Sequence, residues 1–277
     1  MKTNMMIPVV VVAATFLFVS CGQAEQHNEQ ASTENAMPSV TPVSMKDLNE
    51  PVDFPGAQIG LGNVTATPNG DSVKLSFSFT VKNYELKNQT SDANSQVCSN
   101  SDKGQHLHFI LDNKPYVALY EPKHETTVLK NSEHYLLAFL SRSYHLSLKN
   151  KEAALVFHFK VDENGKLQKL DDPKTPMLFY SRPKGDYFGK DTENVLFDFY
   201  VWNATLGADY QVKTNINSGG KDTSFMITEW KPHFLKNLAM GKTKITLSLI
   251  DKNGNKVEGP ETEVSREIQL SKEEPIQ

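Results

Sequence analysis

The sequence predicts an all-β protein made of two tandem immunoglobulin-like β-sandwich domains. After about residue 45, the chain is a series of short runs in which apolar and polar residues alternate, and turn residues separate these runs. Helical periodicity is scarce in this region. The two halves also carry matching patterns, and a half of roughly 100 residues with about seven short strands suits an immunoglobulin-like sandwich.

The first 20 residues predict a lipoprotein signal peptide. Lys2 provides a positive start, and the apolar run from Ile7 to Val19 is too short to span a bilayer. The segment Leu17–Cys21 (LFVSC) resembles a bacterial lipobox, which implies cleavage before Cys21 and attachment of lipid to that residue. The alternative is a plain secretory signal whose cysteine has no such role.

Composition divides the rest of the chain. Residues 21–44 are rich in Gln, Glu, Asn, Ser, Thr and Pro and have no apolar period, so they predict a lipidated cysteine and a disordered tether. The polar segment 162–175 predicts a domain boundary, with the first sandwich at 45–165 and the second at 166–277. The predicted localisation is the cell envelope of a Gram-negative-type bacterium. The protein would be anchored there by lipid, and the outer membrane is the expected membrane.

The alternating runs predict the individual strands. In the run Val73–Val81 every second residue is apolar and would face a core. The run that begins at Gly104 carries the only His-x-His pair in the chain and turns at Asp112-Asn113. Further strands are predicted at 135–140, 154–161, 195–201, 210–214, 225–228, 244–250 and 266–270.

The two halves look like copies, which predicts an internal duplication. Five residues of the first half recur at identical spacing in the second: Phe77, Phe79, Val81, Asn83 and Leu86, then Phe197, Phe199, Val201, Asn203 and Leu206. Further matches pair Lys114-Pro115 with Lys231-Pro232 and Leu137 with Leu247. By this alignment Thr223 and Phe225 take the places of the two histidines. Alternation forces apolar matches between any two strands, but it does not require the shared asparagine or the Lys-Pro pair.

The histidine pair is the candidate metal site. His106 and His108 share one face of their predicted strand, whereas Leu107, Phe109 and Leu111 share the other face and would point into the core. The two histidines then lie about 6.6 Å apart along the strand, at a rise of about 3.3 Å per residue. Two imidazoles at this spacing can converge on a metal ion with Zn–N bonds of about 2.0–2.1 Å.

Two ligands do not complete a metal site. The candidates to complete it are Cys98, His134 and His145, all in the first half. If Cys21 is lipidated, Cys98 has no partner for an intramolecular disulfide. Cysteine together with histidine suits copper or zinc. The alternative is that the histidines are an exposed or interface feature, because alternation places polar residues outward.

Composition and motifs exclude several classes of function. The formal net charge is -4 and no long basic run occurs, so nothing indicates a nucleic-acid surface. Only Arg142, Arg182 and Arg266 are arginine, which leaves few guanidinium groups for anion recognition. No nucleophile motif or nucleophile–base pair can be assigned, so the protein is predicted not to be an enzyme.

Three segments have a distinctive sequence: GQHLHFILDNKPY from Gly104, LAFLSRSYH ending at His145, and GDYFGKDTENVLFDFY from Gly185. These segments resemble an uncharacterised family of bacterial envelope lipoproteins, and the resemblance covers nearly the whole mature chain. Some of its members are labelled phosphopeptide-binding, which implies an anion or partner site around Arg142 and Tyr144. Where relatives read Ser-Arg-Pro-Trp-His, this chain has Ser141-Arg-Ser-Tyr-His145.

The sequence as a whole predicts a non-catalytic, lipid-anchored envelope protein that acts as a binding or scaffold module. One alternative is a periplasmic protein that binds copper or zinc through His106 and His108. Another is recognition of a phosphopeptide or a protein partner. The expected partners are the membrane, through the lipid anchor, and a protein or peptide, but no nucleic acid.

Overall fold

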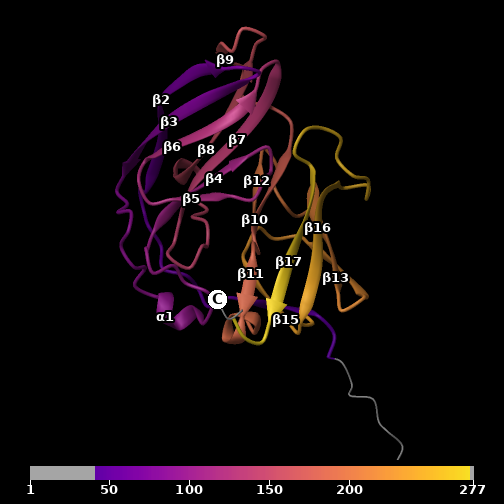
Figure 1. Ribbon diagram of the computed structural model, residues 1–277. Coiled ribbons are helices and arrows are strands. Elements are labelled where there is room, and N and C mark those ends of the chain that lie inside the picture. Colours follow the sequence, from indigo (N-terminus) through magenta and orange to yellow (C-terminus); the bar gives the residue numbers. More distant parts are fainter. Residues whose placement is uncertain (1–40, 275–277) are drawn as a thin grey trace, which may run out of the picture. The chain divides into compact units, whose positions relative to one another are not determined.

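We describe a computed structural model of the chain, in which residues 41–274 are described (Figure 1). The predicted signal peptide, the lipidation site Cys21 and nearly all of the predicted tether lie outside these residues. No helix within 41–274 has the length and apolar character needed to cross a membrane.

The first half forms a β-sandwich from two antiparallel sheets. One sheet has the order β2 (Gln58–Asn69), β3 (Ser72–Lys82) and β6 (Lys123–Leu129). The other has the order β5 (Val117–Leu119), β4 (His106–Leu111), β7 (Ser132–Ser141), β8 (Ala154–Val161) and β9 (Leu167–Lys169). A short helix, α1 (Ala93–Gln96), and a 3-10 turn, Lys151–Ala153, complete it. Alternate residues of both sheets, such as Phe77, Phe109 and Phe159, form its core.

The second half forms another sandwich. Its four-stranded sheet has the order β1 (Ser44–Asp47), β15 (His233–Lys236), β12 (Val195–Trp202) and β10 (Met177–Arg182). Its five-stranded sheet has the order β11 (Asp186–Phe188), β17 (Glu263–Ser271), β16 (Gly241–Asp251), β13 (Tyr210–Ser218) and β14 (Lys221–Ile227), with a 3-10 turn at Gly189–Thr192. Two tandem immunoglobulin-like sandwiches are therefore present, and the predicted fold class is confirmed.

Strand β1 departs from the predicted division of the chain. Met45–Asp47 fall within the range predicted for the first sandwich, yet β1 pairs antiparallel with β15, with Ser44 opposite Lys236. The N-terminal strand thus belongs to a sheet of the second half, and the chain crosses to the first half only after Asp47. A prediction from composition misses this pairing because β1 is only four residues long.

The two sandwiches share one strand order. The sheets β2-β3-β6 and β10-β12-β15 match, as do β5-β4-β7-β8 and β14-β13-β16-β17. The predicted counterparts Asn83 and Asn203 both have positive φ angles, of 54° and 52°. Each donates a side-chain hydrogen bond to a backbone carbonyl oxygen, that of Gly56 or Pro173 respectively. This common order is what an internal duplication predicts.

The register of the predicted alignment differs from the structure. In β7 the core-facing residues are Leu136, Ala138 and Leu140, whereas Leu137 faces away from this core. In β16 the core-facing residue is Leu247, so its pairing with Leu137 is one residue out of register. A slip of one residue exchanges the two faces of a strand.

The Lys-Pro alignment also differs, because the counterpart of β4 is β13 and not β14. Leu107 lies opposite Leu140 in the first sheet, and Val212 lies opposite Leu249 in the second. The residues that correspond to His106 and His108 are therefore Gln211 and Lys213, rather than Thr223 and Phe225. Lys213 is exposed and Gln211 is half-buried. The histidine-bearing face is thus specific to the first half.

That face is buried against the second half. Buried residues of both halves form one cluster there: Ile110, Tyr116, Leu137, Phe139, Ala154, Met177, Phe179 and Tyr200. Polar contacts join the halves as well. Asn113 accepts a hydrogen bond from the Tyr180 N–H and donates one to the Leu178 carbonyl oxygen. The Lys149 ammonium lies 2.7 Å from the carboxylate of Asp198, which is 1% exposed.

Candidate metal centre

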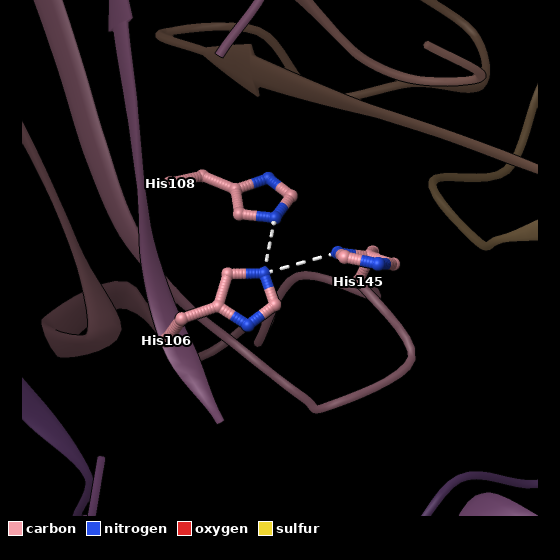
Figure 2. Close-up of side chains that lie close together, drawn as sticks. All are labelled: His106, His108 and His145. Atoms are coloured by element: carbon pink, nitrogen blue, oxygen red, sulfur yellow. Dashed lines mark hydrogen bonds between the residues drawn. The ribbon is translucent and has the colours of Figure 1, made fainter. Parts of the chain in front are cut away.

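Three imidazole rings converge in the interior of the protein. Nε2 of His106 lies 3.0 Å from Nε2 of His108 and 3.1 Å from Nδ1 of His145 (Figure 2). All three ligand nitrogens lie within 4.8 Å of one another. Within residues 41–274, no other group of three or more His, Cys, Asp or Glu side chains has the arrangement of a metal site. Of the predicted completing residues, the structure brings His145 to the pair.

Strand β4 fixes the first two rings. Its alternation directs both histidines away from the core of the first sandwich and into the contact with the second. His106 and His108 are fully buried, and their ring centroids lie 4.9 Å apart. His106 pairs with Ser141 at the end of β7, so the turn that follows β7 begins beside the rings.

A strained turn supplies the third ring. The turn is closed by hydrogen bonds from the Arg142 N–H to the Leu146 carbonyl and from the His145 N–H to the Arg142 carbonyl. His145 has a φ of 69°, which lies in the left-handed region that L-residues other than glycine rarely adopt.

The second half contains the same turn with a glycine at this position. There Asp251 N–H bonds to the Asn255 carbonyl, and Gly254 N–H bonds to the Asp251 carbonyl. Gly254 has a φ of 83°. The first half therefore carries a histidine where the turn favours glycine. Strain of this kind often accompanies a functional role.

The hydrogen bonds of His106 direct its lone pair inward. Nδ1 of His106 lies 2.8 Å from the carbonyl oxygen of Gly104, and a carbonyl can only accept. The proton of neutral His106 is therefore on Nδ1, and its Nε2 presents a lone pair to the two other rings. Because His106 Nε2 is the acceptor, His108 donates the 3.0 Å hydrogen bond from its own Nε2, and its Nδ1 accepts from the hydroxyl of Ser181 at 3.2 Å. Metal-binding histidines are oriented by partners of this kind.

Burial keeps all three rings neutral at pH 7. It lowers the pKa of His106 to about 4, and the charges of Arg182 and Lys184 add to this effect. Burial also holds the pKa values of His108 and His145 well below the ordinary range. Neutral imidazoles are the form that binds metal ions, since the lone pair is then free. The cluster can therefore offer three nitrogen ligands without first losing protons to solvent.

Two predicted ligands lie elsewhere. The nitrogens of His134 contact Asp112 at 2.8 Å and Ser132 at 2.6 Å. Cys98 packs on a separate hydrophobic cluster that includes Tyr144 and Leu196. Burial raises the pKa of the Cys98 thiol to about 12, which disfavours the thiolate that metals bind. Neither side chain belongs to the histidine cluster.

The residues predicted for anion binding are engaged within the protein. The Arg142 guanidinium donates to the carbonyl oxygens of Val52 and Ser147, and only 5% of the residue is exposed. Tyr144 is fully buried and donates its hydroxyl hydrogen bond to Asp92. Arg142 thus attaches the segment before β2 to the turn after β7, which is a structural role.

Three residues around the rings come from the second half and could not be found by sequence reasoning about the first. Ser181, Arg182 and Lys184 belong to the end of β10 and the turn after it, in the second half. Tyr116 lies in the first half, and its hydroxyl oxygen is 3.3 Å from Nδ1 of His145. Only the packing of one sandwich on the other brings the residues of the second half to the rings.

Comparisons with known proteins leave the family open. No protein-family model and no curated protein matches the chain. Among solved structures, it is similar to the fibronectin(III)-like modules of CbhA from Clostridium thermocellum, with 11% identity and a TM-score of 0.27 over 78% of this chain and 95% of that one. It is also similar to the extracellular domain of the putative hybrid two-component system BT3049 from B. thetaiotaomicron, with 10% identity and a TM-score of 0.28 over 77% of this chain and 44% of that one. Similarity at this level carries no functional inference.

The strain at His145 predicts an unusual order of stabilities. Glycine usually destabilises a chain relative to alanine, but at a φ of 69° the order should reverse. We expect His145→Gly to be more stable than His145→Ala by about 1 kcal/mol, because both variants lack the imidazole and differ in backbone strain. Urea unfolding of the two variants measures the difference. An alanine variant as stable as the glycine variant would show that the turn relaxes without strain.

The low pKa of His106 predicts acid sensitivity. An unfolded histidine has a pKa of about 6.5, so below this pH the unfolded chain binds a proton that the folded chain does not. The contribution of neutral, buried His106 to the free energy of unfolding is fully present above pH 6.5. It is lost as the pH falls toward 4, at about 1.4 kcal/mol per pH unit. We expect the free energy of unfolding to decrease between pH 6.5 and pH 5, and to decrease less steeply in His106→Gln. Equal slopes in parent and variant would contradict the assignment.

Proposed function

We propose that this protein binds a transition-metal ion, copper or zinc, through His106, His108 and His145. The observation that supports the proposal is the convergence of three imidazole nitrogens within 4.8 Å, two of them on fully buried rings. A tetrahedral ion with bonds of about 2.0–2.1 Å separates its ligand atoms by about 3.3 Å. The separations of 3.0 Å and 3.1 Å that His106 makes are close to this value, and the nitrogens of His108 and His145 lie within 4.8 Å of each other.

The chemistry of the donors favours the same ions. Imidazole suits zinc, copper, iron and nickel, whereas calcium and magnesium prefer oxygen ligands. Among divalent ions, copper binds a given nitrogen site most tightly. In the neutral rings, the single lone pair of His106 Nε2 is approached by two other nitrogens. A bound cation would accept a lone pair from each nitrogen, with the proton of His108 moved to Nδ1, where the Ser181 hydroxyl can accept a hydrogen bond.

The proposal fits a non-catalytic role at the cell envelope. The predicted localisation and the lipid anchor at Cys21 rest on the N-terminal sequence alone. Metal binding is compatible with a binding or scaffold module, since neither requires catalysis. A phosphopeptide site at Arg142 gains no support, because three of the guanidinium N–H groups donate to backbone carbonyls.

Metal titration of the purified protein tests the proposal. We expect the parent to take up close to one equivalent of Cu(II), and Zn(II) more weakly. The double variant His106→Ala/His108→Ala should bind at least about 100-fold more weakly, because loss of a ligand costs more than the 10–100-fold that loss of a ligand's own partner costs.

The matched control removes the same number of imidazoles outside the cluster. His124→Ala/His158→Ala should bind metal as the parent does, since neither ring belongs to the group of three. Absence of uptake by the parent would rule the proposal out. Equal losses in both double variants would assign the uptake to adventitious surface binding.

A further inference from the structure

We propose that the three-histidine centre selects the monovalent ion Cu(I) over Cu(II) and Zn(II), and that Arg182 and Lys184 of the second half set this preference. The inference rests on the proposed function and extends it, because it names the oxidation state of the bound ion. It also assigns a role to two cationic side chains outside the group of three histidines.

The two cations lie against the aromatic ring that covers His108. The Tyr116 ring stacks on that of His108, with centroids 3.6 Å apart and planes at 7°. Nζ of Lys184 lies 4.3 Å from the centroid of the Tyr116 ring, and the guanidinium carbon of Arg182 lies 5.5 Å from it. Ser181, the neighbour of Arg182 in the sequence, contacts His108 directly. The end of β10 and the turn after it thus bring two positive charges to the histidine cluster.

Neutral groups hold both cations in place. Arg182 donates to the hydroxyl oxygen of Tyr187 at 3.0 Å, and Lys184 donates to the carbonyl oxygen of Tyr116 at 2.8 Å. Arg182 is only 6% exposed, so dissolved ions screen its charge weakly. A neutral partner does not cancel a charge. Both side chains therefore remain positive toward any ion that the histidines bind.

The positive charge acts on all three rings of the cluster. Burial is the main cause of the low pKa values of these histidines, and Arg182 and Lys184 lower each pKa further. The same repulsion acts on a bound metal ion, and it is twice as large for a divalent ion as for a monovalent one. The cost of taking an ion out of water also rises with its charge. Three neutral imidazoles supply no negative charge to offset either cost, so the site favours Cu(I).

The number of ligands favours the same ion. Structural Zn(II) sites in proteins are almost always four-coordinate, and nitrogen sites of Cu(II) are square-planar or tetragonal. Cu(I) has a filled d shell and is stable with three nitrogen ligands. Within residues 41–274, the group of His, Cys, Asp and Glu side chains that could hold an ion consists of His106, His108 and His145 (Figure 2). Cu(II) and Zn(II) would need a further ligand there, whereas Cu(I) would not.

Competition titrations measure the preference. Cu(I), supplied under nitrogen, is divided between the protein and bathocuproine disulfonate, and Cu(II) and Zn(II) are titrated against chelators of known affinity. All proteins carry Cys98→Ser, so that this thiol does not bind Cu(I). We expect the parent to bind Cu(I) at least about 100-fold more tightly than Cu(II) or Zn(II), because the site disfavours the second charge.

The variant Lys184→Met tests the origin of the preference. Loss of one positive charge relieves a divalent ion of twice the repulsion that a monovalent ion loses. We expect the variant to bind Cu(II) more tightly than the parent does, and the ratio of Cu(I) affinity to Cu(II) affinity to fall about tenfold. Lys190→Met is the matched control. It removes the same charge from an exposed residue of the second half and should keep the ratio of the parent.

The outcomes separate this inference from the proposed function. Cu(II) or Zn(II) binding at the three histidines that is as tight as Cu(I) binding would overturn the preference and leave the metal site intact. An unchanged ratio in Lys184→Met would overturn the role of the cations. Cu(I) uptake that persists in His106→Ala/His108→Ala would place the ion elsewhere and overturn the inference as well. Failure of the parent to bind any of the three ions would reject both. The affinities of the parent need no charge variant, so the test stands even if Lys184→Met does not fold.

Discussion

The candidate site depends on one constraint, the burial of the outward face of β4 beneath the second sandwich. In an ordinary two-sheet sandwich this face would meet water, and its polar residues would be solvated. Here Ile110 and Phe139 of the first half pack with Met177 and Phe179 of the second. His106 and His108 lie on the same face and lose their water in the same contact. Their neutrality and their mutual approach both follow from this packing.

The second half shows the corresponding strand face, on β13, without another sandwich packed on it. The residues that correspond to the histidine pair are Gln211 and Lys213, and the lysine is exposed. The corresponding turn carries Gly254, where its positive φ is free of strain. The first half thus differs from the second at all three positions that form the cluster. It brings three polar rings together, two of them fully buried, and strains one backbone residue, although the same strand order forms without either feature.

The sequence was a good guide where alternation was strong. Runs such as Val73–Val81 and Lys244–Ile250 form strands, and the placement of His106 and His108 on one face of β4 follows from period 2. Short or polar strands gave no such signal. Strand β6 reads KHETTVL, and β1 has only four residues. The one-residue error between Leu137 and Leu247 arose because β7 is apolar on both faces, so alternation could not distinguish them.

The completion of the site was beyond sequence reasoning for a different reason. Cys98, His134 and His145 were equal candidates, because residue type does not report where a turn directs its side chain. The distance of 3.1 Å from Nδ1 of His145 to Nε2 of His106 decides between them, and it becomes visible only in the structure. Arg182 and Lys184 approach Tyr116 through the packing of the two halves, which no local pattern encodes.

The central claim is that His106, His108 and His145 form a metal centre. Anomalous diffraction from crystals grown with Cu(II), recorded at the copper absorption edge, tests it most directly. Our account predicts one dominant peak enclosed by His106, His108 and His145, at about 2.0 Å from each nitrogen, as is usual for imidazole ligands. A dominant peak elsewhere on the protein, or full occupancy by copper with these three nitrogens uncoordinated, would contradict it.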